Sequence, residues 1–145
     1  MKPKAFLGQL DHERIVTAIR EAEGRSRGEV RVHVSSQQVE DAQAAARRQF
    51  EKLGMAETAE RNGVLIYVAP ASQKFAVIGD SGIHEHCGSG FWTAVADAMQ
   101  EDFRKGLFTD GLVKGVTRTG QALAEKFPRT EAADRNELSD DVSED

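Results

Sequence analysis

The sequence predicts a single-domain α/β/α sandwich, in which helices cover both faces of a mixed β-sheet. Three observations support this fold class. Segments with helical spacing alternate along the chain with short apolar segments of strand length. A strand–helix–strand crossover over residues 29–69 predicts two parallel strands. The connection of residues 70–73 is too short for a crossover, so the strands that flank it should form an antiparallel hairpin.

Four segments carry apolar residues on one face at the helical period, and each is a predicted helix. They are residues 11–24, 38–53, 92–103 and 109–127. Asp11 and Thr109 are suitable N-caps for the first and the last of these helices. Trp92 lies on the apolar stripe of the third, where we expect it in the core. Gly24 and Gly54 follow the first two stripes and should end those helices.

Three further segments have the features of strands, namely residues 29–35, 62–69 and 74–79. The first alternates valine with polar residues, so one of its faces should be buried, and His33 should lie on the other, at the surface. The second is a continuous apolar run, which is typical of a central strand covered on both faces. The order of elements is therefore helix–strand–helix–strand–strand–helix–helix.

Length and composition are those of one globular domain. A chain of 145 residues with 39% hydrophobic and 30% charged residues can bury a core and stay in water. No apolar run approaches the roughly 20 residues that cross a bilayer, and the first residues lack the apolar core of a signal peptide. We therefore expect a cytoplasmic protein without membrane insertion. The single cysteine, Cys87, excludes an intramolecular disulfide framework.

The net charge of −5 resides in the C-terminal segment. Residues 129–145 contain seven acidic residues and two arginines, whereas acids and bases are balanced in residues 1–128. We expect residues 1–128 to form the domain and residues 129–145 to be a disordered acidic tail, because the tail has almost no apolar residues to bury. The tail is interpreted as solubilising, with an interaction arm as the alternative. A neutral body lacks the positive charge typical of nucleic-acid binding, so no nucleic-acid partner is expected.

Several blocks of sequence resemble the TPM domain, a family named for a thylakoid-lumen protein with reported phosphatase activity. The blocks are Phe50-Glu-Lys-Leu-Gly-Met, Asn62-Gly-Val-Leu-Ile-Tyr-Val-Ala, Lys74-Phe-Ala-Val-Ile-Gly-Asp-Ser-Gly-Ile and Phe103-Arg-Lys-Gly-Leu-Phe-Thr-Asp-Gly-Leu. The resemblance implies an α/β/α sandwich. It also implies, in some relatives, a divalent metal (usually calcium) near the strand ends, and in others acid-phosphatase activity. Arg61, His84 and Ser89 stand where the family often has acids.

The densest polar cluster is the sequence Asp80-Ser-Gly-Ile-His-Glu-His-Cys. We interpret residues 79–90, which contain four glycines, as an irregular loop at the carboxyl end of the third strand. Loops in this position commonly bear functional sites. Asp80 and Glu85 are candidate oxygen ligands for calcium or another divalent metal, and Glu29 and His84 complete the candidate set.

Other interpretations of this segment stay open. Zinc could be held by His84, His86, Cys87 and Asp80, although their spacing matches no standard zinc motif. The glycines and the first amides of a helix that begins near Ser89 could receive an anion. Cys87 could act as a nucleophile beside a histidine. The simplest interpretation is that residues 79–90 form a turn without a functional role, in which the glycines adopt the required backbone angles. Glu29 would then face solvent at the start of its strand.

Two functions of different classes follow, with an assembly protein as a third. The first is a TPM-like binding or accessory module, which binds a metal or an unknown protein partner. The alternative is a metal-assisted acid phosphatase, a phosphomonoesterase that uses Asp80 and Glu85 with help from Glu29. Convergence of these three residues and His84 on one open pocket would favour the enzyme, and their separation would favour the module.

Overall fold

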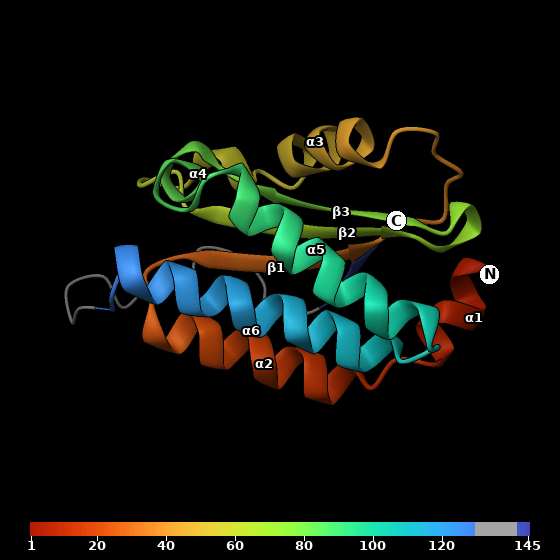
Figure 1. Cartoon of the computed structure of the whole chain (residues 1–145). Helices are drawn as coiled ribbons and strands as arrows, with labels where there is room; N and C mark the ends of the chain where they lie inside the picture. Colours follow the sequence, from red (N-terminus) through yellow and green to blue (C-terminus); the bar gives the residue numbers. More distant parts are fainter. Residues whose placement is uncertain (130–141) are drawn as a thin grey trace.

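A four-stranded mixed sheet forms the middle layer of the computed structural model (Figure 1), which describes residues 1–129 and 142–145. The strands are β1 (Glu29–Val34), β2 (Gly63–Ala69), β3 (Lys74–Gly79) and β4 (Ser143–Glu144), in the order β3-β2-β1-β4. β1 is parallel to both of its neighbours, and β2 and β3 are antiparallel. The predicted α/β class, parallel crossover and hairpin are thus confirmed.

Helices cover both faces of this sheet. They are α1 (Pro3–Gly8), α2 (His12–Arg25), α3 (Ala42–Lys52), α4 (Ser81–Cys87), α5 (Ser89–Arg104) and α6 (Phe108–Lys126). In Figure 1, α3 lies on one side of the sheet, and α2, α5 and α6 lie on the other. Within the described residues, no helix combines the length and apolar character that a membrane span requires.

β2 is central because its side chains are buried on both faces. Val64, Ile66 and Val68 belong to the larger core cluster, which α2, α5 and α6 cover. Leu65 and Tyr67 belong to the smaller cluster beneath α3. All seven residues of β2 are buried, as the continuous apolar run predicts. The sheet therefore separates two cores, and the crossover helix α3 closes the smaller one.

Two aspartates fix the start of the first two long helices. Asp11 accepts a hydrogen bond from the Arg14 amide at 3.2 Å and caps α2, as predicted. Asp41 does the same for α3 with the Ala44 amide at 3.1 Å, so this helix begins later than the apolar stripe suggests. The predicted cap Thr109 instead accepts a hydrogen bond from the backbone of Asp11 at 3.0 Å, and thereby links α2 to α6.

The interpretation of residues 79–90 as an irregular loop is wrong. Residues Ser81–Cys87 form α4, and α5 begins at Ser89. The glycines suggest a turn, but Gly82 lies within α4, where it allows the helix to pack closely on residues 60 and 61. A Cβ atom at this position would lie 2.3 Å from the carbonyl oxygen of Glu60. The short helix α1 was also not expected from the sequence.

His33 is buried, whereas the sequence suggests a surface position. Its residue is 1% exposed, and its ring is stacked on Tyr67 with centroids 5.8 Å apart. Ser143 and Glu144 lie beside it as β4, in register with His33 and Val34. Residues 130–141 of the predicted tail lie outside the described residues. No periodicity in the sequence indicates β4.

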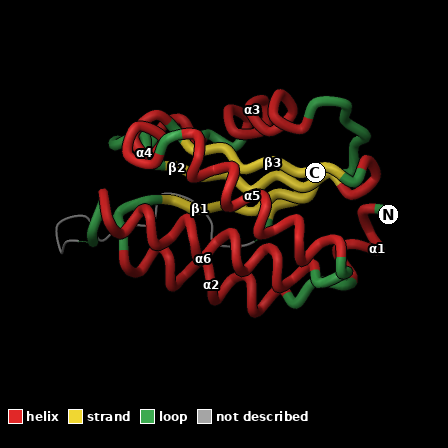
Figure 2. Tube along the Cα trace, in the orientation of Figure 1, coloured by secondary structure: helices red, strands yellow, loops and turns green. Residues whose placement is uncertain are grey.

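Of the three helices on this side of the sheet, α2 and α6 lie side by side in Figures 1 and 2. Their backbones approach closely at Gly120 and Ala22. A Cβ atom at position 120 would lie 2.5 Å from the Cβ of Ala22 and 3.1 Å from its Cα. The contact leaves no space for a methyl group, and backbone atoms cannot move aside as the end of a flexible side chain could.

Gly120→Ala should therefore lower the free energy of unfolding, by about 1–3 kcal/mol, because overpacking outweighs the better helix propensity of alanine. The matched control is Gly24→Ala in α2, where a Cβ atom meets nothing within 4 Å. We expect that control to be neutral or to stabilise by up to about 1 kcal/mol. Chemical denaturation of both variants measures the difference, and equal effects would contradict the proposed contact.

Candidate functional site

A cavity of about 610 Å³ opens at the carboxyl end of β3, between α3, α4 and α5. We call it the strand-end cavity. Phe50 and Ile78 contribute apolar surface, and Trp92 forms part of the wall. Its charged and titratable lining residues are Arg47, Glu51, Arg61, Asp80 and His84. In the part of the chain that the structure describes, this is where the predicted site residues come closest to sharing a pocket.

Asp80 and Arg61 form a bidentate ion pair in this cavity. The guanidinium donates from Nε to Oδ2 at 2.8 Å and from Nη2 to Oδ1 at 2.9 Å. Asp80 is 8% exposed, whereas the Arg61 side chain is 53% exposed. The hydrogen bond from the Ser81 amide to Oδ1, at 2.7 Å, makes Asp80 the N-cap of α4. The carboxylate thus has donors on both oxygens, and hydrogen bonding to it raises the pKa of Arg61.

The backbone of Arg61 is fixed by its contact with α4. The residue has a φ of 53°, in the left-handed region that non-glycine residues seldom adopt. Its carbonyl oxygen accepts a hydrogen bond from the Gly82 amide at 2.8 Å. Asp80 begins α4, and α4 packs on the backbone of Arg61 through Gly82. The contact between Gly82 and Arg61 therefore sets the position of both partners of the ion pair.

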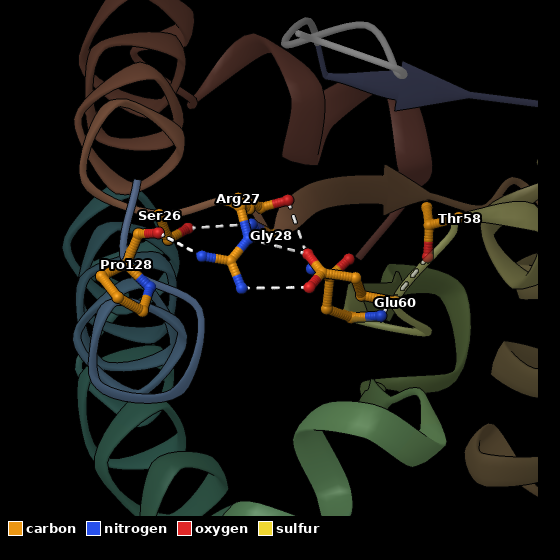
Figure 3. A network of polar contacts seen from close by, with 7 residues as sticks. Ser26, Arg27, Gly28, Thr58, Glu60 and Pro128 are labelled. Carbon is orange, nitrogen blue, oxygen red and sulfur yellow. Dashed lines mark hydrogen bonds and ion pairs between the residues drawn. The ribbon is translucent and has the colours of Figure 1, made fainter. Parts of the chain in front are cut away.

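A second ion pair holds Glu60, the residue just before Arg61 in the turn that precedes β2 (Figure 3). Arg27 donates to the two carboxylate oxygens of Glu60 at 2.9 and 3.0 Å and to the carbonyl of Pro128. The hydrogen bond from Arg27 lowers the pKa of Glu60. The ion pair stabilises the fold fully above the pKa of a free glutamate. This stabilisation is lost as the pH falls through the lowered pKa of Glu60. Neighbouring residues Glu60 and Arg61 are therefore anchored to different parts of the fold.

Trp92 and His84 form another polar contact of the cavity. The indole Nε1 donates to His84 Nδ1 at 3.0 Å. Since indole nitrogen can only donate, Nδ1 is an acceptor, and Nε2 carries the ring hydrogen. The sequence places Trp92 in the core, but the residue is only half-buried and lines the cavity. Its ring lies over Gly79, where a Cβ atom would be 2.3 Å from Cζ2.

The four predicted metal ligands do not lie in one pocket. Asp80 and His84 line the strand-end cavity, whereas Glu85 is exposed on α4 and Glu29 opens β1. Glu29 is 2% exposed, so its expected solvent-facing position is wrong. Among the described residues, no three His, Cys, Asp or Glu side chains are grouped so as to hold a metal ion. Calcium takes six to eight oxygen ligands, and this donor set does not fit it.

The candidate soft ligands divide between two cavities, since Asp80 and His84 line the strand-end cavity and His86 and Cys87 line another. His86 Nε2 is 3.3 Å from a carboxylate oxygen of Glu125 on α6, outside the strand-end cavity. Cys87 is half-buried against the larger core cluster. Burial, and then the charge of Glu125, raises the pKa of its thiol. A raised pKa disfavours the thiolate, which is the reactive form of cysteine.

Sequence reasoning noted Arg61 only as a departure from an acidic pattern and missed its role as the partner of Asp80. The hairpin contained the signal. Pairing of β2 with β3 places Val64 opposite Gly79, so the residues just before β2 meet those just after β3. An arginine and an aspartate at these two ends predict an ion pair. Arg47 carried no signal, because only the packing of α3 brings it to the cavity.

Fold and site together define an α/β/α domain with a polar cavity at the end of its β-hairpin. A family model described as the TPM domain matches residues 1–122. The chain therefore belongs to the TPM domain family, as its sequence blocks predict. No curated protein matches the chain.

Two solved structures are similar to this one. The NMR structure of the BA42 protein from the psychrophilic bacterium Bizionia argentinensis has a TM-score of 0.84 and 38% sequence identity, and the match covers 94% of this chain and 96% of that one. The N-terminal domain of a protein from P. gingivalis has a TM-score of 0.58 and 21% identity, with 82% and 76% covered. The second similarity shows the fold alone.

Gly79→Ala should change the fluorescence of Trp92, the only tryptophan of the chain. The added methyl group would displace the indole from its place over the strand and break its hydrogen bond to His84. We expect a shifted emission maximum in the folded state. Gly90→Ala, in the first turn of α5, is the matched control, because a Cβ atom there meets nothing within 4 Å. Identical spectra for both variants would contradict the described wall of the cavity.

Proposed function

We propose that this chain is a non-catalytic binding domain of the TPM family, with the strand-end cavity as its ligand site. In this proposal the Arg61–Asp80 ion pair takes the place of a bound cation. The observation that carries it is the bidentate contact of the Arg61 guanidinium with both oxygens of Asp80, inside an open cavity. The guanidinium supplies a permanent positive charge in a planar geometry that matches a carboxylate.

Asp80 already has a cationic partner, and this supports a metal-free binding site over one with a resident metal. A divalent ion would have to displace Arg61 from the carboxylate and would find few further oxygens. Ser81 also donates to Asp80, and that bond is part of the N-cap of α4. Because the carboxylate already stabilises the start of a helix, its removal would cost about 1 kcal/mol even without any ligand.

The lining of the cavity favours a ligand with both apolar surface and hydrogen-bond acceptors. Binding sites for small molecules combine apolar walls with a few placed polar groups. Phe50, Ile78 and Trp92 supply the walls here. Arg47 and the Nε2 nitrogen of His84 supply donors. Occupancy of the cavity should therefore change the emission of Trp92, which makes this residue a direct reporter for ligand screening.

The alternative function, a metal-assisted phosphomonoesterase, receives less support. That chemistry needs a metal to polarise the phosphoryl oxygens and to activate water. Its candidate residues divide between different surroundings, since Glu29 is buried at the start of β1 and Glu85 does not line the cavity. We therefore favour binding without turnover.

Calcium added to chelator-treated protein should leave the melting temperature unchanged, because Arg61 occupies Asp80. Arg61→Asp should create a calcium-dependent rise, since it places a second carboxylate beside Asp80 in a backbone conformation that aspartate tolerates. A ligand that binds only the folded state at a hundredfold excess over its dissociation constant adds about 2.7 kcal/mol of stability. Thermal unfolding with and without calcium measures both effects.

Arg47→Asp is the matched control, because it makes the same charge change in the same cavity at a residue that is not paired with Asp80. It should not gain a response to calcium. A calcium-dependent rise in the unsubstituted protein, lost in Asp80→Ala, would overturn the proposal. Hydrolysis of para-nitrophenyl phosphate by the metal-loaded protein would overturn its non-catalytic part.

A further inference from the structure

The segment Val142–Asp145 is held on the side of β1 that faces away from β2. Asp145 accepts hydrogen bonds at Oδ2 from the Ser36 amide at 2.6 Å, from the Ser35 hydroxyl at 2.8 Å and from the Ser36 hydroxyl at 3.0 Å. Its Oδ1 is 2.7 Å from His33 Nε2. One carboxylate thus receives four donors from the end of β1 and the residues that follow it, in an arrangement that can recognise an acidic side chain.

The His33 ring is part of this site and is rigidly held. Its side chain is 2% exposed, and the ring is stacked on Tyr67. A carboxylate can only accept hydrogen bonds, so Nε2 carries a hydrogen toward Asp145. The second ring nitrogen, Nδ1, is 3.0 Å from the Ser143 hydroxyl. Both ring nitrogens of a buried histidine are therefore used to bind residues of this one segment.

The Ser35 hydroxyl is oriented by a contact that does not involve the segment. Its oxygen accepts a hydrogen bond from the Gln37 amide at 3.1 Å, which directs its own hydrogen toward Asp145. The Ser35 amide in turn donates to Val68 of β2 at 2.8 Å. None of the donors belongs to the segment, because His33 lies in β1 and Ser35 and Ser36 follow that strand directly. They are therefore available to any peptide that reaches them.

The backbone pairing of the segment is short. In the described part of the chain, β4 pairs with only two positions of β1, and Val142 packs against the edge of the larger core cluster. A two-residue ladder is marginal on its own. Most of the specificity therefore comes from an apolar residue, a hydroxyl and an aspartate at positions 142, 143 and 145.

We propose that this edge of β1, with His33, Ser35 and Ser36, is a binding site for extended acidic peptides, which the chain's own residues Val142–Asp145 fill in the resting state. A peptide that presents an apolar residue and, three positions later, an aspartate would add to β1 as a parallel strand and exchange with the resident segment. Addition of a strand to an exposed sheet edge is a common mode of peptide recognition. This site is separate from the strand-end cavity and does not rest on the function proposed for it.

The electrostatics of Asp145 agree with a built carboxylate site. Burial acts to raise the pKa of this residue, but the hydrogen bonds from the Ser36 amide, Ser35, His33 and the Ser36 hydroxyl outweigh it and lower the pKa to about 2. A depressed pKa means that the bound form is the ionised carboxylate. The contact is therefore complete at neutral pH and is lost only as the pH falls through that low value.

The test uses the full chain with Val142→Gly and Asp145→Asn, which removes the apolar anchor and the carboxylate and so vacates the site. The probe is a synthetic peptide of residues 137–145, amidated at its C-terminus. It should bind the vacated chain at least tenfold more tightly than the unsubstituted chain, where the resident segment competes. Binding should shift the amide resonance of Ser36 and the ring resonances of His33 in NMR spectra.

Two altered peptides separate recognition of Asp145 from general charge attraction. The Asp145→Asn peptide should bind at least tenfold more weakly, whereas the Glu144→Gln peptide, with the same loss of charge at an exposed residue, should bind within about threefold of the original. No binding to the vacated chain at millimolar peptide would overturn the proposal. Equal losses for both peptides, or shifts located elsewhere in the domain, would also overturn it.

A measurement on the unsubstituted segment makes the test independent of the vacated chain. In the full chain, Asp145→Asn should speed hydrogen exchange at the Ser36 amide at least tenfold, because this amide donates to the carboxylate at 2.6 Å. Glu144→Gln should leave that exchange rate unchanged. Slow exchange at Ser36 that persists in Asp145→Asn would show that the carboxylate is not bound there, and would overturn the proposal.

Discussion

The complete burial of β2 is the constraint on which the rest of the molecule depends. Every residue of this strand is removed from water, and the side chains of a strand alternate between opposite faces of the sheet. Both faces must therefore be covered by other elements, and both edges must be paired to satisfy the buried backbone. β1 and β3 supply the edges, α3 covers one face, and α2, α5 and α6 cover the other. The strand-end cavity lies where these covering elements meet the end of β3.

Periodicity predicted the parts of the fold that depend on local pattern. The apolar run of β2, the alternating valines of β1 and the stripes of the long helices each identify an element without reference to the others. α4 escaped this reasoning because Gly82 is present for a contact with Glu60, which is distant in sequence. His33 escaped it because its covering partner, Asp145, lies 112 residues away.

The candidate site was predicted less well than the fold, because its chemistry depends on which charges meet. Asp80 and His84 do share a cavity, but Glu29 and Glu85 do not join them. Position at the end of a strand identified the region, whereas the partner of Asp80 comes from the turn before another strand. The contact of Gly82 with Arg61 sets that geometry, and the pairing of β2 with β3 brings the two residues of the ion pair together.

Asp80 and Asp145 both accept hydrogen bonds at both carboxylate oxygens, but from different kinds of donor, and the difference bears on function. Asp80 is paired with a permanent cation and also begins a helix, so both of its roles are internal to the fold. Asp145 is held by His33 of β1 and by the serines that follow this strand, and its own segment is paired over only two residues. A carboxylate fixed within the fold is suited to building a cavity. A carboxylate on a short strand is suited to exchange, because its donors belong to residues 33–36 and not to the strand that carries it.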